Sequence, residues 1–189
     1  MPESNHKKFN HLKIHTQYSI CEGAIKIDEL KDNAKELKIS ALGMCDTSNL
    51  CGAVEFSDKL SKVGTQPIIG TQIYFKFNDT VGLLPLFALD FEGYKKIIEL
   101  SSRSYLENDD LSDPHLDINN LLRLDTNGIS VFSGTIFRLF GKLFDKAKFD
   151  EIINLYKKLN AVFGDRFYLE IQRHEDPNEI EFEKFNLDQ

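Results

Sequence analysis

The chain has 189 residues, which is enough for one domain with a hydrophobic core. Its 23 Lys and Arg against 30 Asp and Glu give a formal net charge of −7, so the surface as a whole is a poor match for a polyanion such as DNA, although a local basic strip stays open. The lack of an apolar run of about 18 residues excludes a membrane span. The three cysteines form no Cys-x-x-Cys pair, which indicates reduced thiols and a cytoplasmic protein.

Strands and helices alternate in the predicted secondary structure. The first half of the sequence predicts, in order, a strand at 12–16, a helix with Asp28 as its N-cap and with Leu30, Ala34 and Leu37 at helical spacing, a strand at 41–45, a helix at 50–63, and strands at 67–75 and 83–89. The second part predicts helices at 91–106 and 118–124, a strand at 129–132, a helix at 149–163, a strand at 166–172, and a helix at 176–186 that Asp176 caps.

This alternation predicts an α/β fold with parallel strands. Six strands are fewer than the roughly seven or eight of a closed barrel, so we expect a barrel that is incomplete at its C-terminus. Residues 1–8 are expected to be a flexible N-terminus and residues 9–189 one domain. In such barrels chemistry occurs at the C-terminal ends of the strands. The polar residues expected there include His15, Asp46, Thr47, Gln72, Thr135 and His174.

Imidazoles and carboxylates from different strand ends could together hold a divalent metal. The candidates by residue type are His11 and His15, four residues apart, together with Glu22, Asp46 and His174. The alternative is structural: Asp46 would cap a turn through the backbone amides that follow it. No Gly-x-Ser-x-Gly elbow, phosphate-binding glycine loop or His-Glu-x-x-His pair is present, which argues against a serine hydrolase, a nucleotide-binding site and a zinc protease of those types.

Six ordered blocks of sequence carry a resemblance to a known family; they lie at residues 10–19, 22–25, 41–50, 52–56, 67–70 and 163–170. Together they resemble the PHP (polymerase and histidinol phosphatase) domain, in the form found at the N-terminus of bacterial DNA polymerase III alpha subunits. The resemblance extends from about Phe9 to about Glu183. It implies a distorted (β/α)7 barrel. Where the site is active, it also implies a phosphoesterase that uses a cluster of up to three divalent metals to activate water.

The resemblance also identifies seven positions of the chain with metal ligands. His15 and Glu22 keep a ligand type there. The other five positions hold side chains that are poor ligands or none at all, namely Lys13, Thr47, Gln72, Leu83 and Thr135. Lys13 could instead pair with Glu22 or Asp46. The resemblance therefore implies a degenerate site, with no cofactor expected or with weak binding of Zn²⁺, Mn²⁺ or Mg²⁺; Mg²⁺ would serve the parent polymerase.

The resemblance implies that this piece is a structural scaffold whose phosphoesterase activity has been lost, and it leaves open whether the piece has any enzymatic activity. Its expected partners are the remainder of the alpha subunit, the proofreading exonuclease subunit that it docks, and the replicase holoenzyme. DNA would be contacted only through the parent polymerase, a nucleotidyltransferase whose catalytic carboxylates are not in this chain, and no membrane is involved. The main alternative is a stand-alone metal-dependent phosphoesterase, and a metabolic β/α barrel is a weaker one.

Overall fold

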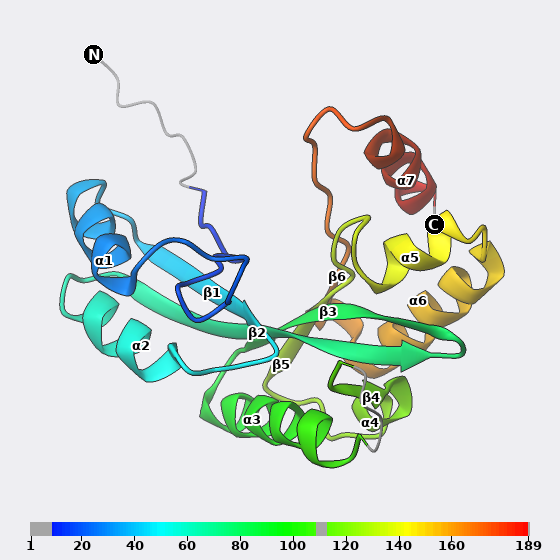
Figure 1. Ribbon diagram of the computed structural model, residues 1–189, viewed down its shortest axis with the longest axis horizontal. Coiled ribbons are helices and arrows are strands. Elements are labelled where there is room, and N and C mark those ends of the chain that lie inside the picture. The colour runs from blue at the N-terminus through cyan, green and yellow to red at the C-terminus, as the bar shows by residue number, and fades with distance from the viewer. Residues whose placement is uncertain (1–8, 109–112, 189) are drawn as a thin grey trace. The chain divides into compact units, whose positions relative to one another are not determined.

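The computed structural model describes residues 9–108 and 113–188. The chain divides into two compact units, one up to Gly70 and one from Thr71 (Figure 1). The predicted flexible segment at 1–8 and part of the predicted polar loop at 108–114 lie outside the described residues. The assignment of everything from residue 9 onward to a single domain stays a prediction.

The first unit is built on two amphipathic helices and a buried strand. Helix α1 (Ile27–Glu36) packs on α2 (Ala53–Ser61), and β1 (Ala41–Thr47) supplies a continuous buried run. The apolar positions of the two helices recur at helical spacing, so one stripe of each is buried. Asp28 lies in the first turn of α1, whereas Lys26 is the residue before the helix, so the predicted cap position is wrong. The core of this unit comprises Ile27, Leu30, Met44, Phe56 and Leu60.

The predicted strand at 12–16 is replaced by two isolated bridges. Ile14 pairs with Met44 of β1, and Thr16 pairs with Ile25, both in parallel. Gly43 allows the close approach, because a Cβ at that position would lie 2.4 Å from the carbonyl oxygen of Leu12. The ladder stops where the amide of Thr16 donates to the carboxylate of Asp46 instead of to a backbone carbonyl. A side chain thus takes the hydrogen bond that a longer strand would need.

Strand β2 (Gln66–Phe77) begins in the first unit and ends in the second. The remaining elements of the second unit are β3 (Thr80–Ala88), α3 (Phe91–Leu106), β4 (His115–Asp117), α4 (Ile118–Leu122), β5 (Ile129–Phe132), α5 (Leu139–Asp145), α6 (Phe149–Phe163), the 3₁₀ turn Gly164–Arg166, β6 (Phe167–Tyr168) and α7 (Pro177–Leu187). Helices α3 and α5 both pack on β3, from opposite sides of the sheet (Figure 1).

The described strands form one mixed sheet in the order β1-β2-β3-β5-β6, with β4 beside β2. The pairs β2–β4 and β5–β6 are parallel, but β3 and β5 are antiparallel. The α/β class is therefore confirmed, whereas the expectation of parallel strands throughout is wrong at β3. The physical reason is the two-residue connection at Asn78 and Asp79, which is too short for the crossover that a parallel neighbour needs.

The strongly amphipathic helices lie at the residues predicted for them. Helices α3 and α6 have the predicted bounds, and the carboxylates of Asp90 and Asp176 cap α3 and α7 through backbone amides. Helix α5 and strand β4 were not predicted. The predicted strand at 166–172 pairs only at Phe167 and Tyr168. Within the described residues, no helix combines the length and the apolar character that crossing a membrane requires.

Candidate functional site at the ends of the strands

The end of β1 carries a buried carboxylate that organises the loop in front of it. The side chain of Asp46 is fully buried. One of its oxygens accepts the backbone N–H of Thr16 at 2.6 Å and the hydroxyl of Ser19 at 2.8 Å, and the other accepts the hydroxyl of Thr16 at 2.6 Å. Buried charge is tolerated when such donors surround it. These three donors come from the loop before the strand, and the alternative that Asp46 caps the turn after it stays a prediction.

The next residue of β1 ties the same loop to the strand a second time. The amide of Thr47 donates to the hydroxyl of Ser19 at 3.0 Å, and the hydroxyl of Thr47 donates to Oε2 of Glu22. The ring nitrogen Nδ1 of His15 lies 3.8 Å from that same oxygen. The structure therefore brings together three of the predicted positions, His15, Glu22 and Thr47, around one carboxylate oxygen. Lys13 is half-buried in the segment that precedes His15.

A second network holds the loop from the outside. The hydroxyl of Tyr18 donates to Glu55 of α2 at 2.8 Å, and this bond raises the pKa of Tyr18. The ammonium of Lys59 lies 2.6 Å from Glu55 and 2.8 Å from Asp28 of α1. These contacts with Lys59 are the main reason why the pKa values of Glu55 and Asp28 are lowered. Both helices thus help to fix the loop that carries His15 and Glu22.

The second unit contains the other positions that the resemblance identifies with ligands. Gln72 of β2 and Leu83 of β3 are buried, and Thr135 is buried just after β5. An amide, an alkyl group and a hydroxyl carry no formal charge. These side chains cannot offset the charge of a metal cation as imidazole together with carboxylate does.

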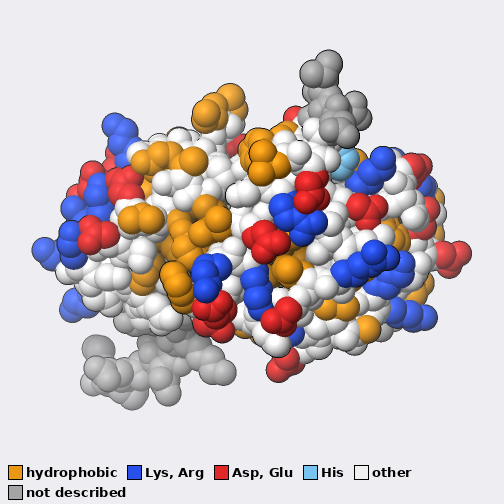
Figure 2. All heavy atoms as spheres, turned by 90° about the horizontal axis from the view of Figure 1, so that it is seen from below, with side chains coloured by type: hydrophobic (Ala, Val, Ile, Leu, Met, Phe, Trp, Pro, Cys, Tyr) orange, Lys and Arg blue, Asp and Glu red, His pale blue; other side chains and the backbone are white. Residues whose placement is uncertain are grey.

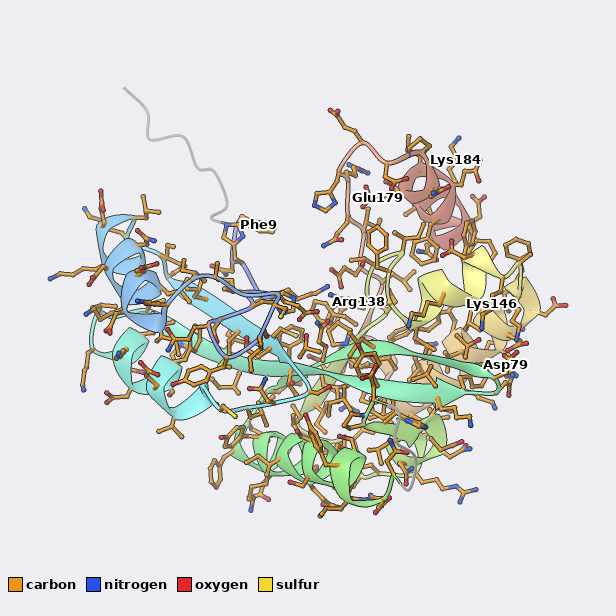
Figure 3. The ribbon with its side chains drawn as sticks, viewed as in Figure 1. Phe9, Asp79, Arg138, Lys146, Glu179 and Lys184 are labelled. Atoms are coloured by element: carbon orange, nitrogen blue, oxygen red, sulfur yellow. The ribbon has the colours of Figure 1, made fainter. Side chains whose placement is uncertain are left out.

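Two further polar groups follow β5 and β6. The buried hydroxyl of Ser133 donates to the carbonyl of Gly134 and accepts the amide of Glu170 at 3.0 Å. His174, predicted at a strand end, lies instead in the loop before α7, where Nδ1 is 3.0 Å from Oε1 of Glu179. Figure 3 labels Glu179 on α7. The exposed imidazole and the amide of His174 lower the pKa of the Glu179 carboxyl.

Three features of this site were not predicted from the sequence. Thr16 and Ser19 supply the hydroxyls that surround Asp46, and Glu179 is the partner of His174. The two hydroxyl residues lie three positions apart at the end of the predicted strand, and this spacing is a signal that could have indicated both. Among residues 9–108 and 113–188, no three His, Cys, Asp or Glu side chains meet in a group that could hold a metal ion.

Comparison with known proteins adds the family. Residues 11–174 match the family model described as "PHP domain". The chain is 34% identical over 192 residues to the DNA polymerase III subunit alpha of Caulobacter vibrioides, covering 95% of this chain and 16% of that protein. It is 36% identical over 186 residues to the DNA polymerase III subunit alpha of Thermus aquaticus, covering 91% and 15%.

A solved structure of a candidate metal-dependent phosphoesterase from Bifidobacterium adolescentis superposes on 51% of this chain and 33% of its own, with a TM-score of 0.42 and 18% identity. The chain spans about 15% of the length of the two curated relatives. The family match extends over most of the chain and agrees with the order of the sequence blocks. This chain belongs to the PHP-domain family.

Proposed function

We propose that this chain is the PHP domain of a bacterial DNA polymerase III alpha subunit and that it works there as a structural scaffold. It supports the polymerase body in the cytoplasm, docks the proofreading exonuclease subunit as part of the replicase, and binds divalent metal weakly or not at all. The carrying observation is that relatives named DNA polymerase III subunit alpha match about nine-tenths of the chain at 34–36% identity.

The donors around the carboxylates support the weak-metal part of the proposal. A metal ligand must offer a lone pair, but the oxygens of Asp46 already accept three hydrogen bonds from Thr16 and Ser19. A metal at Glu22 would have to displace the hydroxyl of Thr47, which offers far less stabilisation to a cation than an imidazole at that position. The geometry of the first unit therefore suits a hydrogen-bonded loop better than a cluster of cations.

The neutral residues of the second unit also support weak metal binding. Clustered divalent ions repel one another, so each needs anionic or imidazole ligands to offset its dehydration. Gln72, Leu83 and Thr135 supply no such charge. The chain's own residues do not fit a metal cluster of the kind that the resemblance implies, so they support no metal-assisted hydrolysis.

Reading the coding sequence beyond codon 189 tests the polymerase part of the proposal. We expect the frame to continue into a region with the paired carboxylates of a two-metal nucleotidyltransferase. A stop codon directly after codon 189 would contradict membership in a polymerase.

Binding to the proofreading exonuclease of the same organism tests the docking part. We expect the purified chain, or the longer polypeptide if the frame continues, to elute with the exonuclease as one complex. Failure of both to bind would contradict docking. Turnover of a phosphate monoester that depends on added Zn²⁺ or Mn²⁺ would instead favour the phosphoesterase alternative.

A further inference from the structure

Helix α5 carries three basic side chains along one side. Arg138 directly precedes the helix, Lys142 lies within it and Lys146 directly follows it. Intervals of four residues place all three on one side of the helix over about 12 Å. Figure 3 labels Arg138 and Lys146 at the two ends of this basic row. Residues 138–158 hold six Lys and Arg against three Asp and Glu, although the whole chain has a net charge of −7. The row is therefore part of a local basic strip on an acidic protein.

Close packing of α5 on β3 holds two members of the basic row in place. A Cβ at Gly82 of β3 would lie 2.5 Å from the backbone of α5, so only glycine allows the helix to lie this near. The ammonium of Lys142 donates to the carbonyl of Val81 at 2.9 Å, and that of Lys146 donates to the hydroxyl of Thr80 at 3.0 Å. Both acceptors are neutral and each ammonium has three donors, so the position is fixed while the positive charge is kept.

The charge of the basic row is not neutralised by ion pairs. Among the residues that the structure describes, no carboxylate forms an ion pair with any of its three members. Lys148 differs, because it pairs with Asp79 and Glu151. The carboxylates near the row are the exposed Asp145 of α5 and Asp79, which acts on Lys146 at longer range. Over most of the face shown in Figure 2, by contrast, basic and acidic side chains are interspersed.

An exposed aromatic ring adjoins the row. Phe137 directly precedes Arg138, and 64% of its surface is exposed. Single-stranded nucleic acids bind where aromatic rings stack on bases and nearby cations meet the phosphates. A duplex fits this combination less well, because its bases are already stacked on one another. A folded acidic protein would need the cations but would gain no stacking from the ring.

We infer that Phe137 and the basic row form a surface that binds single-stranded DNA. A base stacks on Phe137, and up to three phosphates contact the basic row. The choice of DNA rests on the proposed function. Binding to the purified chain requires neither polymerase activity nor the exonuclease, so failure to bind is distinguishable from failure of the proposed function. Because the net charge of −7 opposes three phosphate contacts, we expect a Kd on the order of 100 μM at low salt.

The salt dependence of binding tests the basic row. The full chain is titrated into a fluorescent oligodeoxythymidylate, and anisotropy is followed between about 50 and 200 mM salt. Three phosphate contacts on a single strand predict a slope of log K against log salt of about −2. Lys142→Gln and Lys146→Gln should each weaken binding several-fold and make the slope shallower by about 0.7. Lys95→Gln on α3, on the opposite side of the sheet, makes the same charge change and should have less than about a two-fold effect.

Two results of this titration would overturn the inference. One is that the chain does not bind the oligonucleotide at low salt. The other is that Lys95→Gln weakens binding as much as the substitutions in the row, which would show a general effect of net charge. Circular dichroism melts of each variant show that the fold is retained.

A second substitution tests the aromatic contact. Phe137→Ala should weaken binding roughly five-fold or more and leave the salt slope unchanged, because stacking releases no counterions. Phe91→Ala on α3, where Phe91 is 70% exposed, is the control and should bind like the parent chain. Equal affinity for a duplex of the same length would overturn the preference for a single strand. Displacement of the oligonucleotide by polyglutamate at the same charge concentration would overturn DNA as the ligand.

Discussion

The ends of β1 and β5 both accept a backbone amide from a neighbouring segment, one through a carboxylate and the other through a hydroxyl. At each end an amide from a neighbouring segment leaves the backbone ladder and donates to a buried side chain. Thr16 donates to the carboxylate of Asp46 at β1, and Glu170 donates to the hydroxyl of Ser133 at β5. The carboxylate gathers two further hydroxyl donors, whereas the hydroxyl has one further bond. The carboxylate therefore fixes several donors of one loop, whereas the hydroxyl fixes a single amide.

Removing the carboxylate at β1 should have the largest effect on stability. Asp46→Ala leaves three buried donors without their acceptor, so we expect a loss of about 3–5 kcal/mol in the free energy of unfolding. Urea denaturation followed by circular dichroism measures it. Asp58→Ala, which removes an exposed carboxylate of α2, serves as control and should cost no more than about 0.5 kcal/mol. Equal losses in the two variants would contradict the special role of Asp46.

Restoring a ligand beside Glu22 should reveal whether the hydroxyl of Thr47 is what keeps metal away. Thr47→His would place a second imidazole at the oxygen that His15 already approaches. We expect Zn²⁺ affinity to rise roughly 10- to 100-fold, measured by calorimetry. Thr47→Gln, a neutral side chain of similar length, is the control. If adding His15→Ala to Thr47→His left the gain intact, the metal would be bound elsewhere.

The end of β5 should be less sensitive than the end of β1. Ser133→Ala removes one acceptor and one donor, so we expect a loss of about 1–2 kcal/mol in the free energy of unfolding. The same urea experiment measures it. A loss as large as that of Asp46→Ala would show that the two strand ends are equivalent and that the charge of the acceptor makes no difference.

The smallest effect is expected from acid at the outer network of the first unit. The pKa values of Asp28 and Glu55 are lowered by Lys59, so their ion pairs add stability above the unfolded pKa near 4 and lose it as the pH falls through the lower folded values. The difference in urea midpoint between the parent chain and Lys59→Met should therefore be constant near neutral pH and shrink below about pH 4. Lys62→Met, at an exposed pair, is the matched control. A difference that grew in acid would have the wrong sign.

The long helices were predicted well because their apolar stripes and caps are formed by residues close together in the sequence. Helix α6 has a regular apolar stripe, and α3 begins at a side-chain cap, so both have the predicted bounds. Helix α5 is apolar on most sides and only seven residues long, which hides its period. Strand β4 has three residues, too few for an alternating pattern.

The sequence identified several residues of the site but not the hydrogen bonds that these residues make. His15 and Glu22 were identified together, and the structure places them 3.8 Å apart. The hydroxyls that surround Asp46 come from 27 and 30 residues earlier, so no local pattern connects them. The predicted strand at 12–16 failed for the same reason, because a distant carboxylate took its amide. Hydrogen bonds between residues far apart in the sequence therefore determine both the surroundings of Asp46 and the end of the pairing at Thr16.

We propose that the carboxylates at the end of β1 accept hydrogen bonds from neighbouring hydroxyls rather than bind a cluster of metal ions. Elemental analysis of the purified chain, after equilibration with Zn²⁺ and Mn²⁺ and removal of unbound ions, tests this most directly. We expect fewer than about one ion per chain, because Asp46 and Glu22 are engaged by hydroxyls and the remaining positions carry no ligand charge. Two or three tightly held ions per chain would contradict it.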